Sequence, residues 1–573
     1  MSSPSSHTLP SPPVARPWRA LLVGSGIGAV LAAGNVYAGL KTGYIDGGSI
    51  TAALLGSLLL SAWARRPAHA LDINLTQTVA SSAAVMSFAA GVGAPMPALA
   101  LLGHPLPAAA ILVWGLALAV LGIAVACLLR GRLIVSEDLP FPSGRATAEV
   151  IAAISTKQGD HRLRSLGAAA ALAALFTYLR DGGPALIPGS WSPSFTVFGY
   201  AAVALTLGIS SSPLLVATGV LVGQRAAISM AIGALLAWAV LAPSALGAGL
   251  AAEATYPALV PVLLWPGLAL MVGSGFAHLA LSWRTFGRSF ADLSALLRNR
   301  STPAAATPTS GARPLILMSL LALVPVFGVG RMGFDLGWVV LLALVPLAVV
   351  LAAVAARAAG ETDQAPVGQV GALAQLGCGA RGVVPSVGAG ALVAGVATQT
   401  AQTLWALKAG QRLGAPVRGQ VIAQLLGAVV GAVVVVPIYT LIHAAYQLGS
   451  EKMPAPAALA WKATAEIAHG SWSLSHPLIL GSSLAALALG VVLTWLERRH
   501  ARWLPSPTAM GAAFVLPASM SITILLGALV MGRLARRAPG FADDHGPPLA
   551  AGGIAGESLM GLVLAALVVI GSR

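Results

Sequence analysis

The chain has 573 residues, of which 57% are hydrophobic and only 9% carry a charge, and its mean hydropathy is +0.84. Because soluble domains carry roughly a quarter charged residues, this composition excludes a soluble globular protein and indicates a polytopic membrane protein. The net charge of +15 comes from Arg residues in short loops between apolar runs. That is the pattern of cytoplasmic loops in membrane proteins, so we predict no nucleic-acid partner.

Most of the apolar runs are continuous and close to the ~20 residues that a helix needs to cross a bilayer. Barrel strands would instead alternate in polarity over runs of ~10 residues. We therefore predict an all-α polytopic membrane protein in the lipid bilayer, with about 14 to 16 transmembrane helices. In chain order the runs lie at 18–40, 46–63, 74–102, 106–129, 165–180, 195–222, 226–249, 259–283, 314–330, 336–357, 384–407, 417–444, 452–470, 476–496, 507–531 and 548–570, with two weaker pieces after Arg132 and Gly368.

The ends and the longest loop suggest how the chain is divided. Residues 1–17 are rich in Ser and Pro and contain no signal-peptide hydrophobic region, so we expect a disordered cytoplasmic tail. Loop 284–313 is basic, and we interpret it as a cytoplasmic linker between an N-terminal half, 18–283, and a C-terminal half, 314–573. With the basic loops inside, the N-terminus is cytoplasmic. We expect a multi-pass protein of the cytoplasmic (inner) membrane.

Two segments do not fit a simple count of crossings. Residues 133–156 and 507–531 each lie between basic residues, and prolines stand at or just before the start of their apolar parts. Pro142-Ser143 and Pro505-Ser506 are 363 residues apart. Paired Pro-broken segments in two halves are a sequence indication of a transporter's binding site. They are either re-entrant, entering and leaving by one face, or ordinary helices with basic residues at both ends.

The first apolar run ends in polar residues whose pattern recurs later in the chain. Lys41 and Lys408 are 367 residues apart, and Asn35 aligns with Gln402 at the same spacing. Each lysine either extends to the membrane interface or binds a substrate carboxylate. The two amides either bind substrate or connect helices. Tyr37 lies in the same stretch and is either an interface aromatic or part of the site.

Four acids are candidates for proton coupling. Glu557 lies within the last apolar run, where the membrane favours a neutral carboxyl unless a cation pairs with it. Glu149 lies four residues after Arg145, so a structural ion pair on one helix face is the alternative to a coupling role. Asp138 precedes a proline and Asp363 lies in a polar loop, and both are either loop residues or proton carriers.

Several kinds of enzyme site have no sequence support. No lysine follows a glycine, so a Walker A loop is absent, and there is neither a His-Glu-x-x-His pair nor a Gly-x-Ser-x-Gly turn. The histidines lack metal-ligand spacing. We therefore predict no enzyme activity, no cofactor and no resident metal. A membrane-embedded enzyme and a passive channel remain the alternatives to a transporter.

Five stretches together resemble one protein family. The chain resembles the oligopeptide transporter family, which includes the yellow stripe-like metal-chelate transporters. The resemblance covers nearly the whole chain, and the absence of Asn-Pro-Gly and Lys-Ile-Pro-Pro-Arg runs places it nearer the prokaryotic branch. The stretches that carry it are Asn35–Gly43, Leu139–Gly144, Gly360–Gly368, Leu407–Gln420 and Gly553–Ser558.

The resemblance implies proton-coupled import of small peptides or metal–chelator complexes, and it is compatible with a homodimer. If the transporter acts alone, an ion gradient must drive such import, because no Walker A loop is present. By alternating access, substrate would bind between the two halves, with Glu557 or Glu149 carrying the proton. The candidate substrate-binding residues are Asn35, Tyr37, Lys41, Thr42, Pro142, Ser143, Gln402, Lys408 and Ser506.

Overall fold

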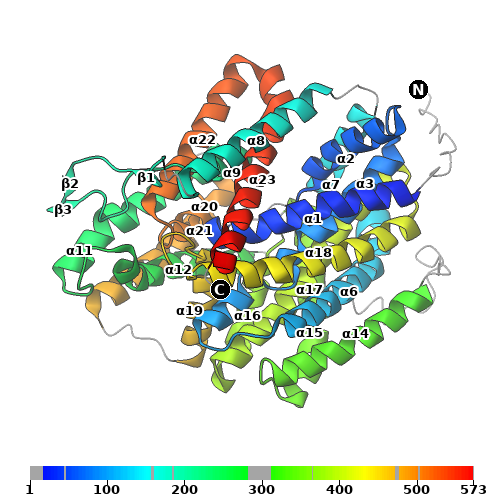
Figure 1. Ribbon diagram of the computed structural model, residues 1–573. Helices are drawn as coiled ribbons and strands as arrows, with labels where there is room; N and C mark the ends of the chain where they lie inside the picture. Colours follow the sequence, from blue (N-terminus) through cyan, green and yellow to red (C-terminus); the bar gives the residue numbers. More distant parts are fainter. Residues whose placement is uncertain are drawn as a thin grey trace.

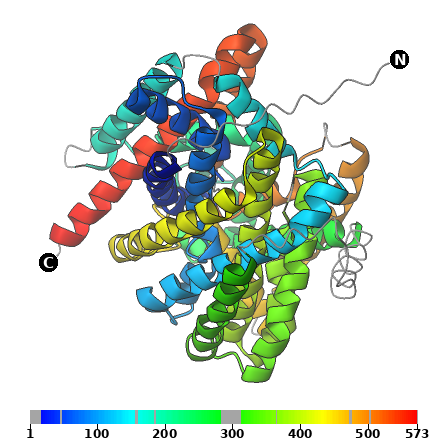
Figure 2. The ribbon, with the colours of Figure 1, turned by 90° about the vertical axis from the view of Figure 1, so that its right-hand side faces the viewer.

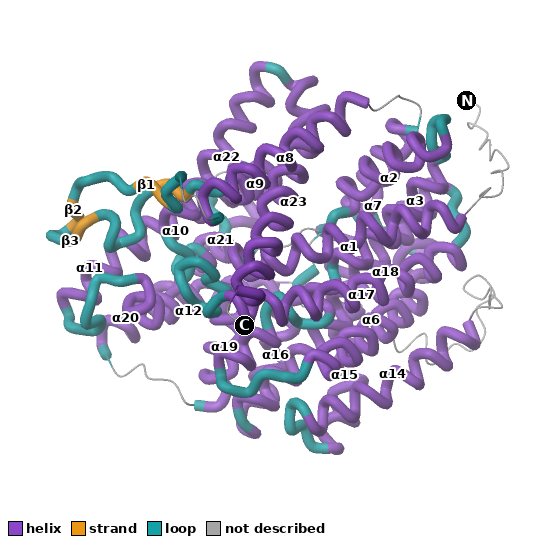
Figure 3. Tube along the Cα trace, viewed as in Figure 1, coloured by secondary structure: helices purple, strands orange, loops and turns teal. Residues whose placement is uncertain are grey.

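The computed structural model describes residues 17–43, 47–155, 160–182, 186–281, 312–363, 365–470, 476–500 and 504–571. These residues are almost entirely helical (Figure 3). Within them, 11 helices are long and apolar enough to cross a membrane, which confirms an all-α polytopic membrane protein. The expected tail, 1–17, and linker, 284–313, lie almost wholly outside the described residues.

The described elements of the first half precede the long gap in the description. They are α1 (Pro17–Thr42), α2 (Ser49–Ala64), α3 (Ala70–Ala84), α4 (Met86–Ala89), α5 (Pro95–Leu101), α6 (Ala108–Arg130) with a π-helical turn at Gly131–Ser136, α7 (Pro142–Ile154), α8 (Asp160–Asp181), α9 (Pro213–Val222), α10 (Gln224–Ala234) with a π-helical turn at Leu235–Leu241, α11 (Ala242–Gly247) and α12 (Tyr256–Leu281). Strand β1 (Ser190–Trp191) pairs with β4 (Ile209–Ser210), and β2 (Thr196–Val197) with β3 (Tyr200–Ala201), both antiparallel.

The described elements of the second half follow the gap. They are α14 (Ala312–Met332), α15 (Trp338–Thr362), α16 (Val367–Cys378) with a 3₁₀ turn at Gly379–Arg381, α17 (Val383–Leu413), α18 (Val417–Ala445), α19 (Pro456–His469), α20 (Pro477–His500), α21 (Pro507–Ala512), α22 (Ala518–Arg537) and α23 (Pro539–Gly571).

Three expected runs are interrupted. The prediction of one crossing at 195–222 is wrong, because Phe198 and Gly199 have positive φ angles of 48° and 87° and form the two-residue turn between β2 and β3. Residues 74–102 are divided among α3, α4 and α5, and residues 507–531 are divided between α21 and α22. The described residues hold 11 helices long enough to cross a membrane, where about 14 to 16 crossings were expected. The runs 74–102 and 195–222 are interrupted, and the runs 46–63 and 452–470 form helices of only 16 and 14 residues.

The contacts between helices define two groups, each built from both halves of the sequence. The α1 group contains α1–α7 and α14–α19, and the α23 group contains α8–α12 and α20–α23. Contacts across the boundary involve α23 with α1, α2 and α18, α8 with α2, and α12 with α16 and α19. Figures 1 and 2 show α23, in red, running beside the end of α1, in dark blue.

The α23 group repeats one packing pattern. In one copy of the pattern, α23 packs on α8 and α9, and α9 also contacts α22. In the other copy, α12 packs on α20 and α21, and α21 also contacts α10. Helix α9 of the first copy therefore corresponds to α21 of the second. The structural counterpart of Ser506-Pro507, which begins α21, is therefore Ser212-Pro213, which begins α9. Helix α7, which begins at Pro142, belongs to the α1 group, and the sequence pairing of Ser506 with Pro142-Ser143 stays a prediction.

Glycines set the distance between packed helices in the α23 group. A Cβ atom at Gly219 of α9 would lie 2.0 Å from the Ile524 carbonyl oxygen of α22, and one at Gly527 would lie 2.1 Å from that of Val216. These contacts involve backbone atoms, so the two helices can cross at this distance only with glycine at both positions.

We expect Gly219→Ala to lower the thermal unfolding temperature of the purified protein, because α9 and α22 must separate. Overpacking of this kind costs about 1–3 kcal/mol. The matched control is Gly167→Ala in α8, where a Cβ would have no neighbour within 4 Å. That control should leave the unfolding temperature unchanged or slightly raised. Equal losses in both variants would contradict the close crossing.

Candidate functional site

Small residues around Glu557 bring three other helices within reach of its side chain. Glu557 lies in α23 and is completely buried. A Cβ at Gly556 would lie 2.1 Å from the Ala170 carbonyl oxygen of α8, and one at Gly561 would lie 2.6 Å from the Tyr37 ring of α1. The glycines of this stretch are therefore required by close packing on both sides of the acid.

Four groups of the described residues contact the Glu557 carboxylate. Lys41 Nζ lies 2.9 Å from Oε1 and Arg180 Nη2 lies 3.1 Å from the same oxygen. The Ser212 hydroxyl lies 2.9 and 2.8 Å from the two oxygens, and the Leu214 amide donates to Oε2 at 2.8 Å. We call these five residues the Glu557 cluster.

The beginning of α9 forms one wall of the cluster. Ser212 is the N-cap of this helix, its hydroxyl accepts from the Leu215 amide at 3.3 Å, and Pro213 is the first helical residue. Ser followed by Pro is a sequence preference for the start of a helix. The Glu557 carboxylate thus lies at the positive end of the α9 dipole, where free amides favour an anion.

Charges around the cluster are balanced. Arg180 also forms an ion pair with Asp181 and donates to the Ser211 carbonyl oxygen. The Lys41 ammonium lies 5.4 Å from the centre of the Tyr37 ring, within cation–π distance. Within the described part of the chain, two cations thus face two carboxylates, and a buried charge without a partner would be very costly.

The ion pair of the cluster connects the two helix groups. Lys41 lies at the end of helix α1 and so belongs to the α1 group. The other members of the cluster belong to the α23 group: Arg180, Ser212, Leu214 and Glu557. Any movement of one group against the other that separates α1 from α23 must break the Lys41–Glu557 contact.

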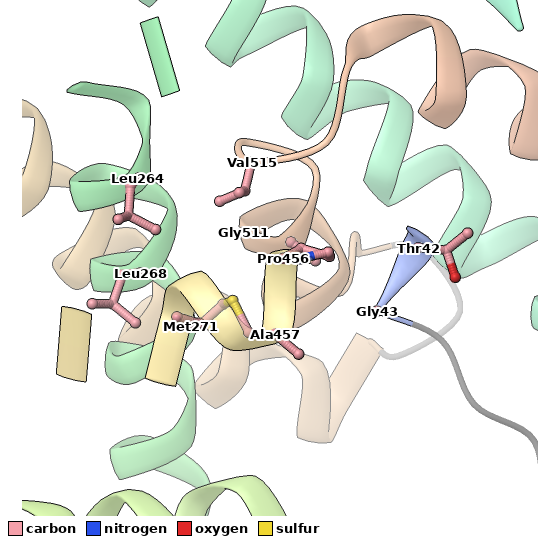
Figure 4. Close-up of a pocket in the computed structure, with 11 residues that line it drawn as sticks. Thr42, Gly43, Leu264, Leu268, Met271, Pro456, Ala457, Gly511 and Val515 are labelled. Atoms are coloured by element: carbon pink, nitrogen blue, oxygen red, sulfur yellow. The ribbon is translucent and has the colours of Figure 1, made fainter. Parts of the chain in front are cut away.

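Two hollows lie on the same boundary. The Thr42 hollow, drawn in Figure 4, has an empty volume of about 450 Å³ including space open to solvent. The Asn35 hollow has about 500 Å³ by the same measure. Residues Thr42, Gly43, Leu264, Leu268, Met271, Pro456, Ala457, Ala460, Gly511, Ala512 and Val515 line the first. Residues Val30, Leu31, Gly34, Asn35, Ala38, Gly48, Thr51, Leu221, Ala551, Ile554 and Ala555 line the second.

Helix α1 passes from one hollow to the other. Ala38 lines the Asn35 hollow and Thr42 lines the Thr42 hollow, and four residues of helix span about 6 Å. Lys41 lies between these positions in the sequence. The Lys41–Glu557 contact therefore lies close to the place where the two hollows approach each other.

The corresponding lysine of α17 has a different partner. Lys408 is almost completely buried, and its Nζ lies 2.6 Å from Asp138 Oδ1 in the loop after α6. The hydrogen bond and charge of Lys408 lower the pKa of Asp138. Asp138 has a φ of 45°, and its side chain is largely exposed.

Two of the family-like stretches pack on each other beside this lysine. The carboxylate of Asp363, at the end of α15, accepts from the Ser143 amide at 2.9 Å and from the Ser143 hydroxyl at 2.6 Å. The Phe141 amide donates to the Gly360 carbonyl oxygen at 2.9 Å. Asp363 therefore caps the start of α7, which is a structural role for this predicted acid.

Three other predicted residues lie in the α1 group. Asn35 donates to the Ala84 carbonyl oxygen at 3.0 Å and lines the Asn35 hollow. Gln402 is buried in α17, with its Oε1 beside Gly47. Thr42 donates to the Ala38 carbonyl oxygen at 2.8 Å.

Three predicted residues lie apart from the Glu557 cluster. Pro142 and Glu149 are exposed on α7. The Ser506 amide donates to the Ser229 hydroxyl of α10 at 2.8 Å, within the α23 group. Neighbours of Ser506 in α21, Gly511 and Ala512, line the Thr42 hollow, so this stretch reaches the boundary through them.

Sequence reasoning missed Arg180 and Ser212. Arg180 was hidden because it ends an apolar run, where a basic residue is ordinary. Ser212-Pro213 was hidden inside the run 195–222, although Ser before Pro is a signal for the start of a helix. Reading that signal would have divided the run at the right place.

The whole chain also matches a known family. The family described as OPT oligopeptide transporter protein matches residues 17–568. The chain belongs to the OPT oligopeptide transporter family. This confirms the resemblance drawn from the five stretches, and it shows a transporter rather than an enzyme.

Several relatives of this OPT chain are similar over nearly their full length. A putative oligopeptide transporter of Haemophilus influenzae is 24% identical, over 93% of this chain and 92% of the relative. A probable metal-nicotianamine transporter of Oryza sativa subsp. japonica is 24% identical, over 96% and 91%. The iron-phytosiderophore transporter yellow stripe 1 of Zea mays is 24% identical, over 90% and 85%.

We expect Asp138→Ala to lower the unfolding temperature of this OPT protein at pH 7, because it removes the carboxylate that pairs with buried Lys408. The loss is on the order of 1 kcal/mol, since Asp138 is largely exposed. The lowered pKa of Asp138 means that the stabilisation is present above its usual pKa and disappears as the pH falls through the lowered value.

The control is the double variant Lys408→Met/Asp138→Ala, which removes both charges. Thermal unfolding of the wild type, both single variants and the double variant between pH 3 and pH 7 measures the coupling. A double variant as unstable as Asp138→Ala at pH 7 would show that the ion pair is not the cause.

Proposed function

We propose that this OPT protein is a proton-coupled secondary transporter that imports small oligopeptides or metal–chelator complexes. The names of its relatives support these two substrate classes. The observation that carries the proposal is the buried Lys41–Glu557 ion pair, which joins two helix groups beside the two hollows on their boundary.

The boundary between the groups is the substrate pathway in this proposal. Both hollows are lined by residues of both groups, so a rocking movement of one group against the other changes their access to the two faces of the membrane. The amides and hydroxyls of Asn35 and Thr42 supply polar contacts there, and the remaining lining is mostly apolar, as in many small-molecule sites.

Glu557 carries the proton in this proposal, with Glu149 as the second candidate. While Lys41 and Arg180 face it, Glu557 has the surroundings of an ionised carboxylate. When the groups separate, the acid loses the Lys41 contact while it remains in a region of low dielectric. Taking up a proton then removes the cost of a negative charge that Lys41 no longer balances. Each proton moved through 100 mV contributes about 2.3 kcal/mol to import.

We expect Glu557→Gln to abolish uptake driven by a pH gradient in proteoliposomes, because the amide cannot take up a proton. Exchange of internal for external substrate should survive, since it needs no net proton movement. The measurement compares labelled substrate uptake with and without the gradient. The control is Glu253→Gln, at an exposed position outside the cluster, which should behave as the wild type.

Undiminished pH-driven uptake in Glu557→Gln would remove this acid from the coupling step. A steady current without substrate, showing no saturation, would instead identify a passive channel.

We expect a carried substrate to raise the unfolding temperature of the purified wild-type protein. The gain is RT ln(1 + [L]/Kd), or about 2.7 kcal/mol at one hundred times Kd. A panel of di- and tripeptides and of metal–nicotianamine complexes separates the two substrate classes. The free amino acids and the metal-free chelator are the controls, and equal responses to a complex and its chelator alone would argue against metal-chelate transport.

A further inference from the structure

The donors around Glu557 form an anion site that does not depend on α23. Lys41 belongs to α1, Arg180 to α8, and the Ser212 hydroxyl and Leu214 amide to the start of α9. All four groups converge on the two oxygens of one carboxylate. Two charges, a hydroxyl and a helix amide are the groups with which proteins bind carboxylate and phosphate ligands.

A second observation concerns buried hydroxyls next to the cluster in the sequence. The Ser558 hydroxyl is completely buried and has no hydrogen-bond partner within the described part of the chain, and the same holds for the buried Ser211 hydroxyl. Ser558 Oγ lies 3.9 Å from the position that a Cβ of Gly34 would take. Gly34 lines the Asn35 hollow. A buried hydroxyl beside a hollow is unusual unless a ligand or water meets it.

We propose that Glu557 is an internal ligand of this anion site, and that a carboxylate of the transported substrate takes its place there. The inference rests on the proposed function and deepens it by giving the substrate a required chemical group. Peptides provide that group at their C-terminus and chelators in their side arms. The Asn35 hollow, beside Gly34, receives the adjoining part of the substrate.

The exchange keeps the charge of the cluster constant. Among the described residues, the charged and titratable groups that face Glu557 are Tyr37 and Lys41 of α1 and Arg180 of α8. Asp181 pairs with Arg180, and Tyr446 lies near Tyr37, Lys41, Arg180 and Asp181. With the tyrosines neutral, two cations face two carboxylates before the exchange. A proton from solvent then binds a Glu557 oxygen, the substrate carboxylate contacts Lys41 and Arg180, and two carboxylates still face two cations. One proton accompanies each substrate carboxylate.

The first test uses acetate as the probe and unfolding temperature as the readout. In Glu557→Ala the site is vacated, so millimolar acetate should raise the unfolding temperature in a saturable manner, whereas acetamide, its neutral counterpart, should not. Wild-type protein should respond to neither, because Glu557 fills the site. The double variant Lys41→Met/Glu557→Ala should require at least tenfold more acetate.

Equal responses of wild type and Glu557→Ala to acetate would overturn the proposal, and so would an acetamide response matching that of acetate. If Glu557→Ala can be purified only with acetate in the buffer and not with acetamide, the result supports the site. Recovery with neither compound would contradict it, since acetate should replace the missing carboxylate.

The second test uses the wild-type protein and separates the two sources of the carboxylate. Trialanine should raise the unfolding temperature at a concentration at least tenfold lower than trialanine amide, if peptides are carried. If chelates are carried, a metal–nicotianamine complex should likewise raise the unfolding temperature at a concentration at least tenfold lower than its carboxamide derivative. Equal potency of a bound acid and its amide would overturn the anion site. A response to none of the four would count against the proposed function, while the acetate test still decides the anion site.

Discussion

Charge burial in the membrane is the constraint on which the structure around Glu557 depends. Removing one partner of a buried ion pair typically costs 3–5 kcal/mol, so the carboxylate, Lys41 and Arg180 must be supplied together. That requirement explains the local structure: α8 ends beside α9, α9 begins with a serine cap, and glycines on α23 let three helices approach. The same interaction joins the two helix groups, so the contact that satisfies the charges also resists their separation.

The two lysines that follow the repeated pattern illustrate how one sequence feature serves two environments. Lys41 faces a fully buried acid from the other helix group, whereas Lys408 faces Asp138, a largely exposed acid in the loop after α6 of its own group. An exposed partner exchanges readily with water, and such a pair contributes only on the order of 1 kcal/mol, less than a fully buried pair whose partner is removed. The buried pair at the boundary is therefore the better place for coupling movement to charge.

Much of the fold could be predicted from local sequence, because apolar length alone identifies most spanning helices and α1 and α17 follow their predicted runs closely. The site could be predicted only in part. Glu557, Tyr37 and Lys41 were recognised as polar groups in apolar runs, but their proximity could not be, since Lys41 and Glu557 are 516 residues apart. The division of the helices into groups and the match of Ser212 with Ser506 depend on packing, which sequence spacing does not report.

The interleaving of the two groups has a consequence for biosynthesis. A ribosome releases the chain from its N-terminus, so Lys41 and Arg180 enter the membrane 516 and 377 residues before the acid that pairs with both. Helix α8 must likewise wait for α23, its main packing partner. The nascent protein thus holds two cations without Glu557 until α23 is inserted. Helix α23 then supplies both the packing partner of α8 and the acid that balances these cations, so the folding of the two groups is coupled to the synthesis of α23.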